Sequence, residues 1–168
     1  IIDQKEFQID LIDDVKTAFG EIIANSHDVI ETRKQLNVED ILIYADIQVK
    51  HAEMLDKEKS LAQSAIEAKE KYADGVIITG KWTGDAPMID HLNEVKKAVG
   101  EDFPIIIGSG ADSKNISKLF QVADQAIVST SLKDGDKKSR EEERNLKSFD
   151  SRISVQKVKE FMAVAKNG

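Results

Sequence analysis

Residues 105–112 read IIIGSGAD, and in this segment three isoleucines precede a glycine–serine–glycine turn. A short continuous apolar run is typical of a strand buried on both faces, as in a parallel sheet. Similar runs occur at residues 41–45 (ILIYA), 75–79 (GVIIT) and 126–129 (AIVS), and a weaker, alternating candidate lies at residues 7–12 (FQIDLI). The sequence therefore predicts a parallel sheet of short, buried strands.

Amphipathic helices are expected between these strands, because apolar residues recur there every three or four positions. The four apolar stripes are Leu61, Ala65, Ala68 and Tyr72; Met88, Leu92, Val95 and Val99; Ile116, Leu119, Phe120 and Ala123; and Val155, Val158, Met162 and Ala165. A further helix is expected within residues 22–36, and Ser113 and Ser154 are candidate N-caps.

Strands that alternate with helices indicate βαβ units and an α/β fold. Two architectures fit, a (β/α)8 barrel and an open doubly wound sheet, and periodicity does not separate them. The length of 168 residues favours the open sheet, because a full barrel needs about 250 residues. The residues that follow the strands favour the barrel.

Composition excludes several classes of protein and predicts one domain over residues 1–168. The net charge of −7 argues against a nucleic-acid partner, and the absence of cysteine excludes disulfides and thiolate zinc sites. Three scattered histidines, with no HExxH, P-loop or GxGxxG motif, predict neither a metal nor a cofactor. No apolar run approaches the roughly 20 residues of a membrane span and no signal peptide is visible, so we expect a cytoplasmic location. Residues 136–150 are almost wholly charged and polar, and we expect a mobile insert there, or alternatively a lid.

A phosphate site is predicted after the third and fourth apolar runs. The third run ends in Gly108, Ser109 and Gly110, and the fourth ends in Ser129, Thr130 and Ser131, followed by Lys133. Small residues admit a ligand to backbone amides, and hydroxyls and a lysine add donors. In a barrel, the ends of strands seven and eight commonly bind phosphate. The alternative for the GSG turn alone is a simple tight turn.

Two further strand ends carry candidate residues. Asp46 follows the first apolar run and is the candidate general acid or base, helped by Lys50 or His51; with two-residue alternation, Asp46, Gln48 and Lys50 would point the same way. The alternative for this group is a structural ion pair. Thr79, Gly80 and Lys81 follow the second run and are candidates to line the same opening; the alternative is a turn anchored by the chain's single tryptophan.

In this order, these strings resemble the BtpA/SgcQ family of (β/α)8-barrel proteins. The resembling pieces are ADIQVKHA (45–52), ADGVIITGKWTG (73–84), IIIGSGAD (105–112), ADQAIVSTSLKDG (123–135) and GEIIANSHDVIETRKQL (20–36). The resemblance implies the C-terminal portion of a TIM barrel of the ribulose-phosphate-binding type, strands four to eight, with three strands before Ile1. The chain departs from the family pattern after Gly135, where the charged insert replaces a short loop.

The resemblance implies a function only in outline, since some members are linked to photosystem I biogenesis and others to sugar-utilisation systems. We expect a protein that binds a phosphorylated small molecule at the strand ends, with an enzyme acting on a sugar phosphate or nucleotide-like ligand as one form of it. The rival hypothesis is a non-catalytic assembly or stability factor on a barrel scaffold. We also expect a homo-oligomer or a missing N-terminal half, because five strands do not close a barrel of eight.

Overall fold

A five-stranded parallel sheet carries the fold. The computed structural model describes residues 6–9, 12–18, 20–49, 52–80, 85–135 and 152–166. Its strands are β1 (Glu6–Ile9), β4 (Leu42–Asp46), β6 (Gly75–Ile78), β7 (Ile105–Ile107) and β8 (Gln125–Ala126).

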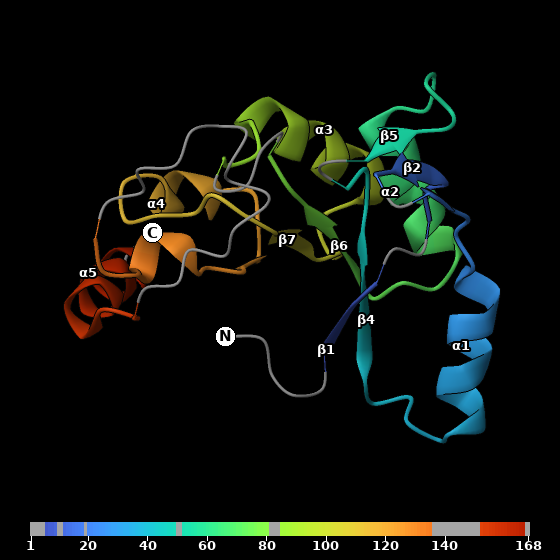
Figure 1. Ribbon diagram of the computed structural model, residues 1–168, viewed down its shortest axis with the longest axis horizontal. Coiled ribbons are helices and arrows are strands. Elements are labelled where there is room, and N and C mark those ends of the chain that lie inside the picture. The colour runs from blue at the N-terminus through green and yellow to red at the C-terminus, as the bar shows by residue number, and fades with distance from the viewer. Residues whose placement is uncertain are drawn as a thin grey trace.

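The order of these strands decides between the two architectures. It is β1-β4-β6-β7-β8, and every pairing in this sheet is parallel (Figure 1). The spatial order of the five strands is therefore the same as their order along the chain. A doubly wound sheet would reverse its order at a switch point. The sequential order is that of a (β/α)8 barrel wall, which confirms the predicted fold class and overrules the argument from length.

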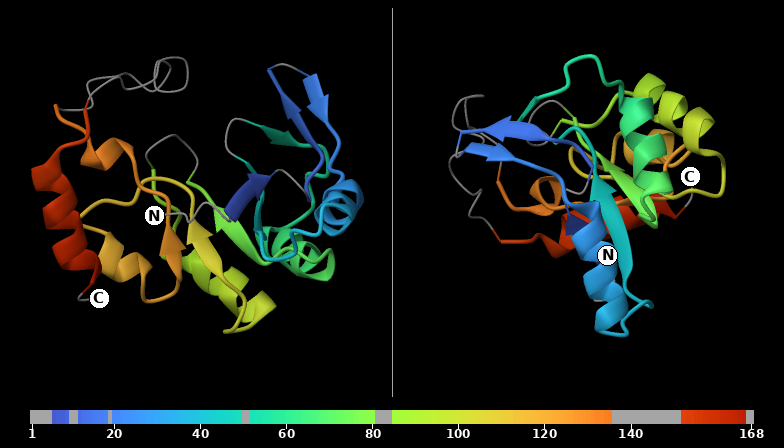
Figure 2. Two further views of the ribbon diagram at one scale, coloured as in Figure 1. Left: turned by 90° about the horizontal axis from the view of Figure 1, so that it is seen from below. Right: turned by 90° about the vertical axis from the view of Figure 1, so that its right-hand side faces the viewer.

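The helices form an arc around the outside of the curved sheet (Figure 2, left). Among the described residues they are α1 (Ser26–Gln35), α2 (Leu61–Glu70), α3 (Ile89–Val99), α4 (Ile116–Leu119) and α5 (Val155–Ala165), and the 3-10 turn η1 (Thr130–Leu132) follows β8. The helix predicted within residues 22–36 is α1.

The sheet is buried on both faces, as its continuous apolar runs predict. The outer face of the strands, with Ile43, Val76 and Ile105 among its residues, packs on the helices in the main core. On the opposite face Tyr44, Ile77 and Ile106 form a separate buried cluster, and partly buried Ile127 packs against it. In a barrel this second face is the interior.

A second, antiparallel sheet was not predicted. It consists of β2 (Val15–Thr17), β3 (Gly20–Ile22) and β5 (Glu53–Met54), in the order β3-β2-β5. Its strands have two or three residues, too few to show an alternating pattern. It lies at the end of the barrel wall where β4 ends (Figure 1).

Three predictions near the C-terminal strands are wrong in detail. β8 covers residues 125–126 rather than 126–129, and the helix expected to reach Ala123 ends at Leu119. Hydrogen bonds from the Gln121 amide to the Lys118 carbonyl and from the Val122 amide to the Leu119 carbonyl form turns after the helix. Ser113 is not an N-cap, because Asn115 precedes α4, whereas Ser154 does precede α5, without a side-chain cap bond.

The end of α2 offers a stability prediction. Tyr72 has a φ of 65°; its amide donates to the Lys69 carbonyl (3.2 Å), and the next amide, of Ala73, donates to the Ala68 carbonyl (3.0 Å). This is a Schellman cap, in which glycine is favoured. The Tyr72 side chain is 72% exposed and contributes little packing. We expect Tyr72→Gly to raise the free energy of unfolding by about 0.5–1 kcal/mol in urea titrations.

Asn37 provides the control for this substitution. It has a φ of 53° in the same kind of cap at the end of α1, and asparagine tolerates that conformation better than tyrosine does. Asn37→Gly should therefore raise the stability by less than Tyr72→Gly. A loss of stability in Tyr72→Gly would show that the ring makes a stabilising contact.

Candidate functional site

The turns after β7 and β8 line one cleft of about 740 Å³. Residues 108–114 and 127–132 supply most of its wall, and Gly135, Lys157, Glu160 and Phe161 supply the rest. Six of the seven residues predicted for a phosphate site lie in this wall: Gly108, Ser109, Gly110, Ser129, Thr130 and Ser131. Lys133 is not among the lining residues. The structure therefore brings the two predicted turns together.

Two glycines of this wall, Gly108 and Gly110, and Gly80 after β6 are required by protein packing. A Cβ atom at Gly110 would lie 2.0 Å from the Ala86 backbone nitrogen, and one at Gly80 would lie 2.3 Å from the Asp85 carbonyl oxygen. A Cβ atom at Gly108 would lie 2.6 Å from the Ile77 Cγ2. The Asp85–Ala86 peptide thus passes between Gly80 and Gly110. Their small size lets the segment after β6 pack on the turn after β7, a role that differs from the expected admission of a ligand.

Two of the predicted hydroxyl donors are already engaged. The Ser109 hydroxyl donates to the Asp85 carbonyl oxygen (3.0 Å), and the Ser131 hydroxyl donates to the Ala111 carbonyl oxygen (2.7 Å). A hydroxyl has one proton to donate, so in this geometry neither serves an anion. Ser129 and Thr130 remain as candidate hydroxyl donors.

The loop between Gly110 and α4 is held by its own side chains. The Asp112 carboxylate accepts bonds from the amides of Lys114 (2.8 Å) and Asn115 (3.1 Å). The Asn115 side chain accepts from the Asp112 amide and donates to the Gly110 carbonyl oxygen, both at 2.9 Å. α4 is a single turn, so its dipole adds little to anion binding, contrary to the expectation of a full helix there.

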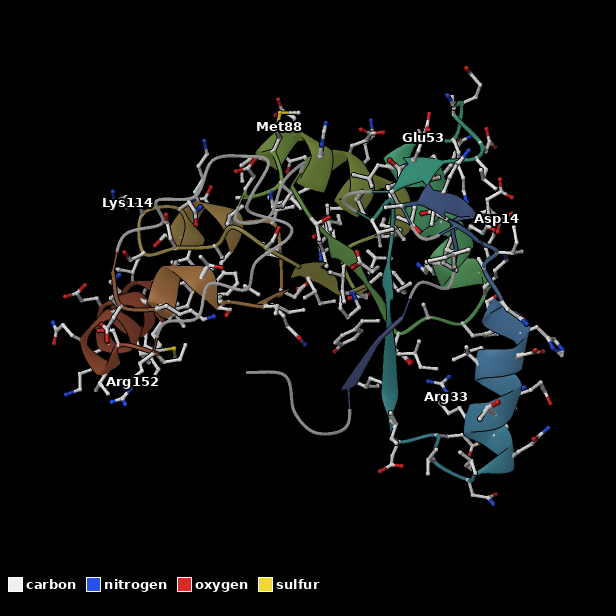
Figure 3. All side chains as sticks on the ribbon, viewed as in Figure 1. Asp14, Arg33, Glu53, Met88, Lys114 and Arg152 are labelled. Carbon is white, nitrogen blue, oxygen red and sulfur yellow. The ribbon has the colours of Figure 1, made fainter. Side chains whose placement is uncertain are left out.

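The cations that line the cleft are Lys114 and Lys157, and neither was predicted from the sequence. Figure 3 shows Lys114 beside α4 and Arg152 near the start of α5, at the same end of the molecule. The Lys157 ammonium donates to the carbonyl oxygens of Lys133 (2.6 Å) and Gly135 (3.4 Å). The one available signal for Lys157 was its place in the first turn of the helix after the predicted site.

Residues 132–134 and 152–154 pair beside the cleft. Lys133 and Ile153 form an antiparallel bridge, with the Asp134 amide bonded to the Arg152 carbonyl and the Ser154 amide bonded to the Leu132 carbonyl, both at 2.8 Å. We call these two segments the neck, because they flank the charged insert. The insert itself, residues 136–150, lies outside the described residues, and so does the prediction made for it.

Asp46 ends β4 on the interior face of the wall. It is 8% exposed and stands in register with Ile77 of the interior cluster. The alternation predicted beyond it is wrong, because Gln48 has a φ of 47° and its side-chain amide bonds to the Lys59 carbonyl and to Ser64 of α2. Thr79 and Gly80 follow β6 as predicted. Lys50, His51 and Lys81 lie outside the described residues.

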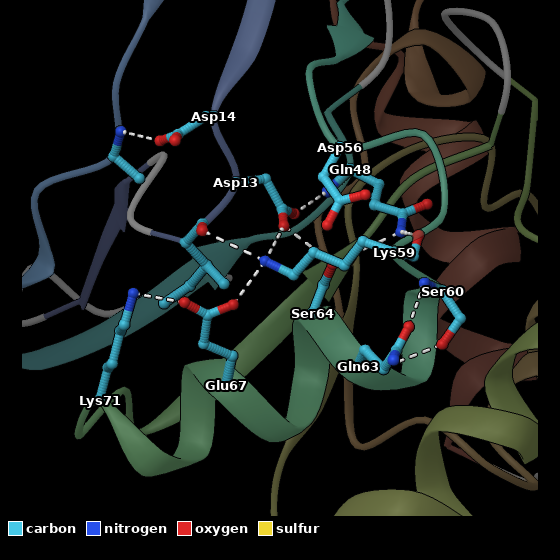
Figure 4. A network of polar contacts seen from close by, with 12 residues as sticks. Asp13, Asp14, Gln48, Asp56, Lys59, Ser60, Gln63, Ser64, Glu67 and Lys71 are labelled. Carbon is cyan, nitrogen blue, oxygen red and sulfur yellow. Dashed lines mark hydrogen bonds and ion pairs between the residues drawn. The ribbon is translucent and has the colours of Figure 1, made fainter.

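A buried polar network joins the ends of β1 and β4 to α2 (Figure 4). Asp13, 5% exposed, accepts from the Gln48 amide (2.7 Å) and the Ser64 hydroxyl (2.8 Å) and pairs with Lys59 (2.8 Å). Lys59 also pairs with Glu67 (2.5 Å). Burial alone would lower the pKa of Lys59, but these two carboxylates outweigh it and raise the pKa. Both carboxylate oxygens of Asp13 have partners, so its role is structural. Among the described residues, no group of three metal-ligating side chains gathers.

The comparisons with known proteins bear on this geometry. A model of the BtpA family matches residues 9–166. The chain belongs to this family. The photosystem I biogenesis protein BtpA of Synechocystis sp. is 37% identical over 114 residues, which is 68% of this chain and 39% of that protein. An uncharacterized mitochondrial protein of Caenorhabditis elegans is 37% identical over 108 residues, 64% of this chain and 38% of that protein. The matched part of this BtpA-family chain thus spans about two fifths of these relatives.

Among solved structures, an isomerase is similar over most of the chain. It is N-(5'-phosphoribosyl)anthranilate isomerase from Pyrococcus furiosus, with a TM-score of 0.48 and 17% sequence identity, covering 84% of this chain and 57% of that one. In the described part of this BtpA-family chain, no helix combines the length and apolar character needed to cross a bilayer.

Proposed function

We propose that the cleft after β7 and β8 binds the phosphate group of a small molecule. The observation that carries the proposal is that two short polar turns, at the carboxyl ends of neighbouring parallel strands, line one cleft. In barrels with sequential strand order, this is where phosphate groups commonly bind. The volume of about 740 Å³ lies within the range of small-molecule sites.

The formal charges around the cleft are balanced, so the hydrogen-bond donors that remain available decide which charge of ligand the cleft prefers. Lys114 and Lys157 oppose Asp112 and Glu160. Asp112 Oδ1 accepts from two amides of its own loop, and Glu160 Oε1 accepts from the Gln156 side chain at 2.8 Å, so both carboxylates keep their charge but are held within their own segments. The lysines and the hydroxyls of Ser129 and Thr130 then favour an anionic ligand.

Phosphate binding can be tested directly. Titration with inorganic phosphate and with ribose 5-phosphate, followed by calorimetry, should show binding that weakens as salt is added. Thr130→Val removes one hydroxyl at nearly constant volume and should weaken binding, whereas Thr32→Val on α1, away from the cleft, should not. If a preparation shown to be folded binds neither ligand, the proposal fails.

An enzymatic role is the stronger form of the proposal. Asp46, on the interior face at the same end of the wall, would act as general acid or base, with Lys50 or His51 assisting. Thr79, Gly80 and Lys81 would border the same opening. With any phosphorylated compound that is turned over, Asp46→Asn should remove turnover and leave the affinity for phosphate unchanged. Retained turnover in Asp46→Asn would remove Asp46 from the chemistry.

The second candidate is a non-catalytic assembly factor, favoured by the similarity to the photosystem I biogenesis protein BtpA of Synechocystis sp.. On this hypothesis the chain retains protein partners and turns over no phosphorylated ligand. Within the described residues, β1 and β8 are the edges of an unclosed sheet, which supports a further part of the barrel or a second copy as a partner. A cytoplasmic location also remains a proposal.

A further inference from the structure

We infer that Lys157, in the first turn of α5, is the cation that holds the bound phosphate and ties it to the neck. This inference rests on the proposed phosphate binding and deepens it. Lys133, the lysine that the sequence suggested, does not line the cleft. Its main-chain carbonyl contributes instead, by accepting a bond from Lys157.

The geometry of Lys157 leaves it able to bind an anion. Its ammonium has three N–H donors, and two carbonyl oxygens, those of Lys133 (2.6 Å) and Gly135 (3.4 Å), engage two of them. Within the described part of the chain, no carboxylate lies within ion-pair distance of it. Carbonyl oxygens orient the ammonium without neutralising it, so the positive charge remains for a ligand.

Lys114 is the competing cation, and it is less constrained. It is exposed, and its hydrogen bond is a main-chain one, from its amide to the Asp112 carboxylate. A flexible lysine loses conformational entropy when it binds, whereas Lys157 is already partly ordered by its two carbonyl partners. Lys157 should therefore contribute more to the affinity for phosphate than Lys114 does.

The same contacts link the ligand to the neck. Lys133 pairs with Ile153, and Gly135 follows directly after Asp134, whose amide bonds across the neck to Arg152. A phosphate bound to Lys157 fixes the ammonium, and the fixed ammonium holds both carbonyls. Since such coupling is reciprocal, phosphate should order the neck as much as an ordered neck favours phosphate.

The test compares charge-removing and charge-keeping variants of one residue. The whole chain is titrated with inorganic phosphate, in Lys157→Met, Lys157→Arg and the control Lys159→Met, an exposed lysine of α5 outside the cleft wall. We expect Lys157→Met to lower the affinity about tenfold or more, Lys157→Arg to retain most of it, and Lys159→Met to leave it unchanged. The salt dependence of binding should also become shallower in Lys157→Met, which a purely structural role would not produce.

Amide hydrogen exchange tests the link to the neck. Phosphate should slow exchange at the Asp134 and Ser154 amides of the wild type and have no effect on them in Lys157→Met. If the wild type binds no phosphate, the proposed function and this inference fall together. If the wild type binds and Lys157→Met binds equally well with the same salt dependence, this inference alone is overturned. Binding through Lys157 with unchanged exchange would overturn the coupling.

Discussion

Gly110→Ala should lower the free energy of unfolding by about 3 kcal/mol, measured by urea denaturation. Two costs add. The residue has a φ of 75°, where a side chain costs about 1 kcal/mol. The new Cβ would also lie 2.0 Å from the Ala86 nitrogen and 2.1 Å from the Asp85 carbonyl carbon, and forced displacement of packed atoms costs roughly 1–3 kcal/mol. These atoms belong to the backbone, so no rotamer change relieves the overlap.

Gly135→Ala is the matched control. Gly135 has a similar φ of 81°, but no atom lies within 4 Å of its Cβ position among the described residues. Its substitution isolates the conformational cost, about 1 kcal/mol. Equal losses in the two variants would mean that the Asp85–Ala86 peptide moves aside freely. Any larger side chain at Gly110 would overlap the same backbone atoms, so a loss of phosphate binding in Gly110→Asp could result from lost packing. Substitution of Lys157 is therefore the better test of the cleft.

The sequence predicted the sheet because its central strands are buried on both faces. Runs such as residues 75–79 and 105–107 need no tertiary information to be recognised as such strands. The choice between barrel and open sheet was different, since it depends on strand order, which local patterns do not encode. The small antiparallel sheet escaped prediction because Gly20, Glu21 and Ile22 of β3 are all exposed and carry no burial pattern.

The sequence also predicted which turns meet at the cleft, but not which donors remain available there. Ser109 and Ser131 carry the right chemistry, yet each donates to a main-chain carbonyl of another segment. Lys157 lies 24 residues beyond Lys133 and reaches the cleft only because α5 packs beside η1. Such assignments depend on contacts between segments distant in sequence.

Two of the sequence segments that resemble the family have, as their second residue, an aspartate with a structural role. In ADG (73–75) and ADQ (123–125), the Asp74 and Asp124 carboxylates accept bonds from the amides of Ile43 and Ile105, both at 2.8 Å. The amides of the same aspartates donate back to the carbonyls of Ile43 and Ile105. Each aspartate thus joins its strand to the preceding one at the amino end of the wall, away from the candidate cleft.

Breaking the Asp13 network should lower the free energy of unfolding at least as much as Gly110→Ala does. Lys59→Met removes the cation that pairs with Asp13 and leaves a carboxylate that is 5% exposed without its countercharge. Breaking a buried pair in this way costs about 3–5 kcal/mol. Lys57→Met is the control, because the Lys57–Glu53 pair (2.8 Å) has side chains 71% and 65% exposed, and its loss should be too small to measure.

The pH dependence of stability separates the charge of this network from its packing. Burial would raise the pKa of Glu67, but hydrogen bonds and charges from Lys59 and Lys71 outweigh it and hold the pKa below the usual 4.5. Because the pKa is lowered in the folded state, ionised Glu67 stabilises the fold above about pH 4.5. This stabilisation is lost as the pH falls through the folded-state pKa. Wild-type stability should therefore fall on acidification in that window, and the fall should be smaller in Lys59→Met. Parallel pH profiles of the two proteins would show that Lys59 acts through the packing of its stem rather than through its charge.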